Sequence, residues 1–123
     1  LDESLIFESN LSEEDGILMA KKILANPKID GLYSSNDTAA ISAIQYLKSE
    51  GIKIPEDIAV VGFNNDPIAA VIEPSLTTVN QPAFEMGKKA SSLLISQIED
   101  KSTVNQSFLL ESELIIRESS NKK

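Results

Sequence analysis

Residues 58–62 are IAVVG, a run of five apolar residues near the middle of the chain. A strand without polar alternation is typical of a parallel sheet whose two faces are both covered by helices. The preceding residues, 52–57, contain Pro55 and several polar side chains and predict a loop, and the polar residues from Asn64 onward predict another. The run therefore predicts a strand that is buried on both faces.

Strands and helices alternate on both sides of this run. The other predicted strands are 5–7, 29–34, 76–80 and 108–116. The predicted helices are 12–26, 37–51 and 83–98, with a helical turn at 68–72 and a polar turn at 99–106. This alternation predicts an α/β fold with a mostly parallel sheet flanked by helices and joined by right-handed crossovers.

The composition excludes most kinds of catalytic and metal site. The 123 residues include neither cysteine nor histidine, which removes Ser-His-Asp and Cys-His pairs and zinc sites built on thiolate or imidazole. We therefore expect no enzymatic activity, no cofactor and no metal. The formal charge is -8 and the 11 basic residues are scattered, so we do not expect nucleic acid to bind this segment directly.

The sequence carries no membrane or targeting signal. No run approaches the roughly 20 apolar residues that span a bilayer. Residues 1–4 contain no basic segment followed by an apolar stretch. Because a predicted strand follows almost at once, we expect further residues upstream of Leu1.

Polar loops follow three of the predicted strands. They are residues 8–11, 34–37 and 63–66, and they are rich in Asn, Asp and Ser. Ligands of open parallel sheets bind at the edge formed by the carboxyl ends of the strands, and amide and carboxylate groups there suit a polyhydroxylated molecule. Asn36 and Asn64 are therefore candidate ligand-binding residues. Asp37 begins a helix, and we expect it to be the N-cap.

Three motifs carry a resemblance to a known family. They are Ser-Asn-Asp at 35–37, Pro-Glu-Asp at 55–57 before Val-Val-Gly-Phe, and Pro-x-Leu-Thr-Thr-Val-x-Gln-Pro at 74–82 before a Met-Gly helix. In this combination, residues 30–90 and 114–119 closely resemble the effector domain of lac repressor family regulators. The resemblance implies a type I periplasmic-binding-protein-like fold, in which a sugar or related effector binds between two subdomains and closure is transmitted to a DNA-binding head.

The resemblance also implies a domain organisation. Residues 1–80 correspond to an incomplete C-terminal subdomain, 81–106 to a crossover and helix of the N-terminal subdomain, and 107–123 to a returning strand and tail. The helix-turn-helix, most of the N-terminal subdomain, and an opening strand and helix with an effector-binding arginine are absent from this sequence. Operator DNA would then be bound only through a head outside this chain, in a cytoplasmic homodimer.

The resemblance assigns site residues one by one. Asn36 matches an effector-binding asparagine, and Asn64 stands where the family usually has an aspartate, a difference for which Asp66 could compensate. Gln81 resembles a glutamine that lines the cleft, although a turn contact near Pro82 is an equal alternative. Leu11 lies near an aromatic position that packs on a sugar face, and a hydrophobic staple before the helix is equally compatible.

Several apolar residues match a symmetric dimer interface in the family. They are Ala39, Ala43, Ile44, Val71 and Ile72. Packing within the chain's own core is an equal alternative for each of them.

Two other function classes remain open from the residues alone. One is an extracytoplasmic sugar-binding protein for transport, which would share the fold. The other is a small-molecule enzyme or phospho-acceptor domain using Asp37, Asp66 and Lys88, although Lys88 lies on a predicted helix in an unsuitable region. The regulator is the interpretation that the combined motifs favour.

Overall fold

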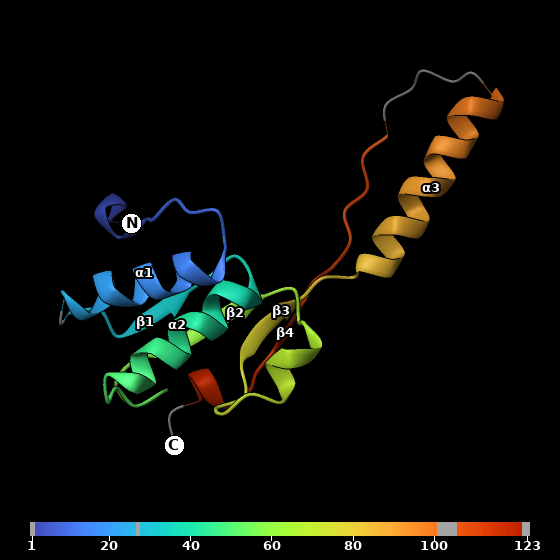
Figure 1. Ribbon diagram of the computed structural model, residues 1–123. Helices are drawn as coiled ribbons and strands as arrows, with labels where there is room; N and C mark the ends of the chain where they lie inside the picture. Colours follow the sequence, from blue (N-terminus) through green and yellow to red (C-terminus); the bar gives the residue numbers. More distant parts are fainter. Residues whose placement is uncertain (1, 27, 101–105, 122–123) are drawn as a thin grey trace. The chain divides into compact units, whose positions relative to one another are not determined.

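The computed structural model describes residues 2–26, 28–100 and 106–121 (Figure 1). The chain divides into two compact units, one made of Leu1–Asn80 with Leu114–Lys123 and the other of Gln81–Glu113. Their assignment to the two subdomains implied by the resemblance remains a prediction, and the turn predicted at 99–106 falls largely on 101–105, outside the described residues.

The first unit is built around a sheet with the strand order β1-β2-β3-β4. These strands are β1 (Gly31–Tyr33), β2 (Ala59–Phe63), β3 (Thr77–Asn80) and β4 (Glu113–Ile115). The register places Leu32 opposite Val60 and Val61 opposite Thr77, and β1, β2 and β3 all run parallel. The predicted α/β fold with a mostly parallel sheet is therefore confirmed.

The apolar run at 58–62 corresponds to β2 as predicted, but residues 59, 61 and 63 on one of its faces are only half-buried, so the predicted burial of both faces is not met. Val60 and Gly62 are buried within β2, and Ile58 just before it is 5% exposed. Helix α2 (Asp37–Ser49) packs against β2 and contributes Ile44 and Leu47 to the same core. Burial of such side chains from both elements supplies most of the stability of this unit.

The helices begin where local sequence signals place them. Helix α1 (Glu13–Leu24) starts with a capping box, in which the Ser12 hydroxyl accepts from the Asp15 backbone N–H and the Asp15 carboxylate accepts from the Ser12 N–H. Helices α1 and α2 pack against one another beside the strands (Figure 1). They approach so closely that a side chain at Gly16 would overlap the Ala39 carbonyl oxygen.

Two predicted strands at the ends of the chain differ from the structure. Residues 5–7 form no strand, because the Asp2 carboxylate accepts the Ser4 N–H at 3.0 Å and stabilises the 3-10 turn η1 (Glu3–Leu5). The last strand covers 113–115 rather than 108–116, and residues 106–112 have no regular structure. An apolar segment becomes a strand only where a neighbouring strand completes its backbone hydrogen bonds.

Short 3-10 turns complete the first unit. Turn η2 (Pro67–Ala70) follows the loop after β2, where a helical turn was predicted. Turn η3 (Glu118–Ser120) packs against β2, and its buried Ser119 donates to the Val60 carbonyl at 2.6 Å and accepts from the Thr77 N–H at 2.8 Å. The end of the chain is thereby joined to the sheet.

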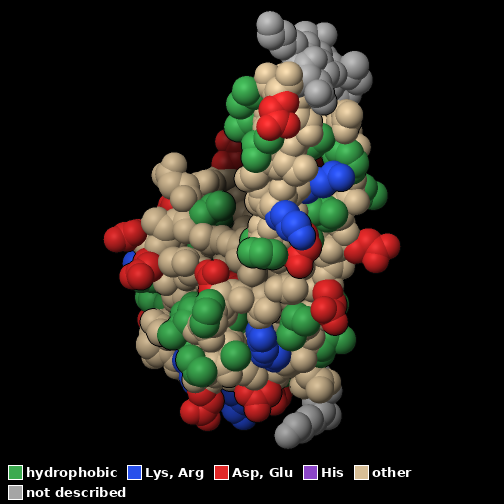
Figure 2. All heavy atoms as spheres, turned by 90° about the vertical axis from the view of Figure 1, so that its right-hand side faces the viewer, with side chains coloured by type: hydrophobic (Ala, Val, Ile, Leu, Met, Phe, Trp, Pro, Cys, Tyr) green, Lys and Arg blue, Asp and Glu red, His purple; other side chains and the backbone are tan. Residues whose placement is uncertain are grey.

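The second unit consists of helix α3 (Ala83–Asp100) and the segment that follows it. Its apolar stripe faces solvent within this unit, since Phe84 is 79% exposed and Ile98 is 69% exposed. Hydrophobic side chains are visible at the surface in Figure 2. Among the described residues, no helix is both long and apolar enough to cross a membrane.

Candidate functional site

The carboxyl ends of three parallel strands form a polar edge of the first unit. We define this polar edge as the loops 34–36 and 64–66 together with Asn80. The strand pairing extends one residue beyond the ladder on both sides of β2, because Ser34 N–H donates to the Val61 carbonyl and Asn64 N–H to the Val79 carbonyl, each at 2.9 Å. The backbone of both loops is therefore held in register with the sheet.

Asn36, rather than Asp37, caps helix α2. Its side-chain oxygen accepts from the Ala39 N–H at 3.0 Å, and its amide nitrogen donates to the Leu11 carbonyl at 2.9 Å. The predicted N-cap at Asp37 is therefore wrong. Because both ends of the half-buried Asn36 amide are engaged, Asn36 joins the start of α1 to the start of α2, and its capacity to bind a ligand is reduced.

Asp37 binds groups of the sheet and of the loop after β2. It is fully buried, with one carboxylate oxygen accepting from the Thr78 hydroxyl at 2.7 Å and the other from the Asp66 backbone N–H at 2.8 Å. Its place in the first turn of α2 favours a negative charge. Gly62 makes room for this carboxylate, since a Cβ atom there would overlap an Asp37 side-chain oxygen. Asp37 thus holds the loop after β2 against the sheet.

The loop after β2 contains two residues in unusual backbone conformations. Asn64 has a φ of 114° and Asn65 has a φ of 56°. Asparagine tolerates the left-handed region better than most residues, but such conformations persist only where the surroundings hold them. Asn64 is exposed and Asp66 is half-buried, so both predicted site residues are accessible at the polar edge.

Asn65 and Arg117 were not among the residues predicted for the site. The Asn65 side-chain oxygen accepts from the Arg117 guanidinium at 2.8 Å, and its amide nitrogen donates to the Asn80 side chain at 3.1 Å. The pair Asn64-Asn65 directly after a strand was a usable signal for positive φ. Nothing in the local sequence indicates the partnership with Arg117, which lies 52 positions away.

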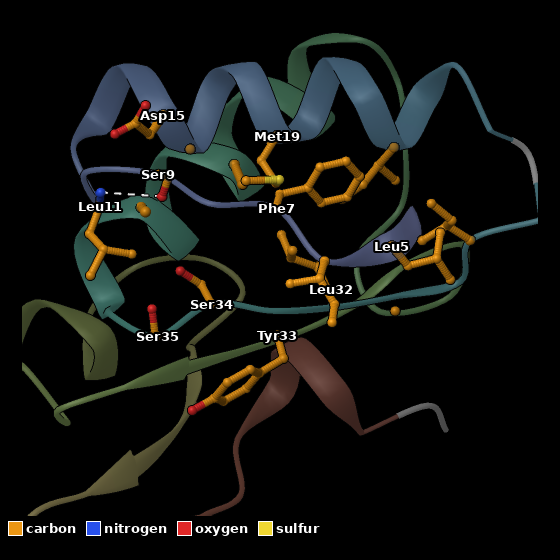
Figure 3. Close-up of a pocket in the computed structure, with 17 residues that line it drawn as sticks. Leu5, Phe7, Ser9, Leu11, Asp15, Met19, Leu32, Tyr33, Ser34 and Ser35 are labelled. Atoms are coloured by element: carbon orange, nitrogen blue, oxygen red, sulfur yellow. Dashed lines mark hydrogen bonds between the residues drawn. The ribbon is translucent and has the colours of Figure 1, made fainter. Parts of the chain in front are cut away.

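Leu11 lies beside the polar edge and borders an apolar groove. It is 37% exposed with a φ of 63°, and its N–H donates to the Ser9 hydroxyl at 3.3 Å (Figure 3). The groove has a volume of about 430 Å³ and runs between β1, α1 and residues 5–11. Phe7, Met19 and Leu32 face one another in it (Figure 3). Ser34 and Ser35 of the polar edge border it, but Asn36, Asn64 and Asp66 do not.

This groove is a poor match for a polyhydroxylated ligand. Its walls are mostly hydrocarbon, so hydroxyl groups placed there would lose hydrogen bonds to water without replacement. The polar edge offers amide, carboxylate and backbone groups instead. We therefore take the polar edge, and not the groove, as the candidate functional site.

Gln81 belongs to the second unit. It is half-buried and directly follows β3, and its carbonyl accepts from the Ala83 N–H at 2.8 Å near the start of α3. Its expected part in ligand binding remains a prediction.

The residues predicted for a dimer interface differ in their accessibility. Ala39, Ala43 and Ile44 are respectively 6%, 1% and 1% exposed and pack within the first unit itself. Ile72 is half-buried beside the core, whereas Val71 is 76% exposed. For the first three residues the packing agrees with the alternative of core packing, so Val71 is the accessible member of the set.

Asp37 and Lys88, considered above for a phospho-acceptor site, lie in different surroundings. Asp37 is fully buried, and Lys88 lies on α3 in the other unit. Within the described part of the chain, no group of three or more acidic residues could hold a metal ion.

Comparison with known proteins agrees with this geometry. The family of periplasmic binding protein-like domains matches residues 3–120. This chain belongs to that family. Among proteins similar to this domain, the HTH-type transcriptional repressor PurR of Vibrio parahaemolyticus is 34% identical over 123 residues, which are 99% of this chain and 37% of that protein.

Solved structures give the same result. A transcriptional regulator CelR-cellobiose complex superimposes with a TM-score of 0.91 at 31% identity, covering 98% of this chain and 37% of that one. A LacI family transcriptional regulator from Enterococcus faecalis with bound ribose gives 0.85 at 31% identity, covering 93% and 42%. The resemblance to the lac repressor family is confirmed, and this domain spans little more than a third of the PurR and CelR chains.

Proposed function

We propose that this chain is the effector-sensing part of a bacterial transcriptional repressor, and that the polar edge binds a sugar or a sugar phosphate. The observation that carries the proposal is the loop 64–66, where exposed Asn64 has a φ of 114° and the next two backbone N–H groups, of Asn65 and Asp66, donate to the Thr78 hydroxyl and the Asp37 carboxylate. Retained backbone strain of this kind is concentrated at ligand sites. The cellobiose and ribose in the two similar structures support the choice of ligand class.

The side chains at this edge suggest how the ligand is recognised. The Asn64 amide offers a donor and an acceptor to adjacent hydroxyl groups, and the Asp66 carboxylate accepts from hydroxyls. Leu11 would cover an apolar sugar face, and Gln81 would add an amide. Because Asn64 replaces the aspartate usual in the lac repressor family, recognition at this position is neutral. Asn36 contributes mainly by holding the edge together.

The remaining parts of the proposal concern the full-length protein. We propose that it works in the cytoplasm as a homodimer without enzymatic activity, and that effector binding changes its affinity for operator DNA through a head domain outside this chain. Differential affinity for two states is sufficient for such control. The relatives named above are regulators of transcription, which favours this function over sugar transport.

The first test is a thermal-shift measurement on the full-length protein with ribose, cellobiose and lactose. Ligand that binds only the folded state raises the melting temperature in proportion to its affinity. We expect Asn64→Gly to reduce the ligand-induced rise while leaving the melting temperature without ligand nearly unchanged, because glycine accommodates the φ of 114°. An equal loss with and without ligand would show a structural role for Asn64.

Asn36 provides a matched pair of variants for the same assay. Asn36→Ala removes the cap of α2 and is expected to cost about 1 kcal/mol without any ligand. Asn36→Asp keeps the capping oxygen and loses the donor to the Leu11 carbonyl. We therefore expect Asn36→Asp to be more stable than Asn36→Ala. A strong loss of ligand response in Asn36→Asp alone would assign Asn36 a direct role in binding.

The proposed homodimer is tested at Val71. Because this side chain is 76% exposed, Val71→Asp should leave the fold intact and place a charge at an apolar contact. We expect the dimer dissociation constant of the full-length protein to rise at least about tenfold in analytical ultracentrifugation, equivalent to about 1.4 kcal/mol. Leu18→Asp on α1, at a residue that is 51% exposed, is the control. Equal dissociation constants for the two variants would exclude Val71 from the interface.

A further inference from the structure

Arg117 is the single arginine of the sequence, and it reaches the loop of the proposed effector site. One guanidinium nitrogen donates to the Leu76 carbonyl and the other to the Asn65 side-chain oxygen, each at 2.8 Å. Its backbone N–H donates to the Thr77 hydroxyl at 2.8 Å. Arg117 is therefore bonded to Leu76 just before β3 and to Thr77 at the start of β3, while its other terminal guanidinium nitrogen reaches Asn65. Hydrogen bonds from a charged donor of this kind are stronger than neutral ones.

Asn65 is the residue through which this contact acts on the loop. It has a φ of 56°, its N–H donates to the Thr78 hydroxyl at 3.2 Å, and its amide nitrogen donates to Asn80 at 3.1 Å. The Thr78 hydroxyl in turn donates to Asp37, which accepts from the Asp66 N–H. Arg117 and Asn80 thus hold the loop at Asn65, and Asp37 holds it at Asp66.

Arg117 and Asn80 both lie close to the points where the chain passes between the two units. Asn80 is the last residue of the first unit before the chain passes into the second, and Arg117 lies three residues after the chain returns at Leu114. Both residues bond to the same side chain, Asn65. A change in the position of Asn65 would therefore alter hydrogen bonds next to both connections between the units.

We propose that Arg117 is a positioning residue for the effector site: through Asn65 it holds the 64–66 loop in its strained conformation and joins that loop to both crossover segments. The inference rests on the proposed function of the loop, but the contact itself can be tested without ligand. Lysine cannot replace Arg117 fully, because a single ammonium does not reproduce the two separated donors of the guanidinium.

The test is hydrogen exchange measured by mass spectrometry on the full-length protein without ligand. In Arg117→Gln we expect exchange of the amides at residues 64–66 to accelerate at least tenfold, while amides within α2 keep their rates. Arg117→Lys should give an intermediate result. Lys53→Gln removes an equal charge at an exposed position and serves as the control. Loop exchange equal to that of the control, or acceleration spread evenly over the first unit, would overturn the proposal.

A second variant, at Asn65, tests the same contact in case Arg117→Gln does not fold. Asn65→Gly removes the same contact from the other side, and glycine suits the φ of 56°. If Arg117 acts through Asn65, the double variant should exchange no faster in the loop than the faster single variant. Additive acceleration would show that the two residues act independently, contrary to the proposal.

The ligand measurement then separates this inference from the proposed function. With any of ribose, cellobiose or lactose that stabilises the unaltered protein, Arg117→Gln should weaken apparent affinity at least tenfold. If accelerated loop exchange is found but affinity is unchanged, the link between the loop and the effector is wrong. If none of the three sugars stabilises the protein, the sugar proposal fails for these probes, and the exchange result alone decides the positioning role.

Discussion

Replacing Gly16 by alanine is expected to lower the free energy of unfolding of the first unit by about 3 kcal/mol, because overpacking a tight contact costs about 1–3 kcal/mol or more. The added methyl group would overlap the Ala39 carbonyl oxygen, which is a backbone atom of α2 and cannot rotate away. Helices α1 and α2 would have to separate, loosening the packing of Ala20 and Ile23. This loss outweighs the gain of about 1 kcal/mol from replacing glycine within a helix.

Gly87 is the matched control for Gly16. It also lies inside a helix, α3, but a Cβ atom there would meet no neighbouring atom within 4 Å. Gly87→Ala is therefore expected to be neutral or to stabilise the protein by about 0.5–1 kcal/mol. Differential scanning calorimetry of both variants in the full-length protein gives the comparison. Stabilisation by both substitutions would mean that the contact between α1 and α2 is looser than the structure indicates.

Replacing Asp37 by alanine is expected to cost about 3 kcal/mol and to abolish the effector response, because a buried hydrogen-bonding group left without its partner costs about 1–3 kcal/mol. Two donors lose their acceptor, namely the Thr78 hydroxyl and the Asp66 backbone N–H. The loop 64–66 would then lose its attachment to α2. Thermal unfolding with and without ribose, cellobiose or lactose measures the two effects together.

Variants of neighbouring groups separate the contributions of Asp37. Asp37→Asn keeps an oxygen for Thr78 and places an amide group opposite the Asp66 N–H, so an intermediate loss is expected. Asp66→Ala leaves the backbone N–H in place and removes a side chain that makes no capping hydrogen bond, so stability without ligand should change by less than about 0.5 kcal/mol. If Asp66→Ala were as destabilising as Asp37→Ala, the Asp66 carboxylate rather than its backbone would be the important group.

The elements that local patterns specify were predicted well. The apolar run at 58–62, the Ser12 capping box and the apolar faces of the helices all depend on residues within a few positions of each other. The two predicted strands that differ, at 5–7 and 108–116, were apolar segments whose outcome depends on whether another strand lies beside them. Periodicity alone contains no information about that neighbour.

The candidate site divides in the same way. The sequence by itself determined that polar loops follow β1 and β2, since the carboxyl ends of parallel strands share one edge of the sheet, and the motifs carried the resemblance that the comparisons confirmed. Only the tertiary structure decided which groups each side chain there contacts. Asn36 caps a helix and Asp37 is buried against Thr78, while Asn65 is held by Arg117 from 52 positions away. The physical reason is that a hydrogen bond needs two groups within about 3 Å, and folding alone brings such distant residues together.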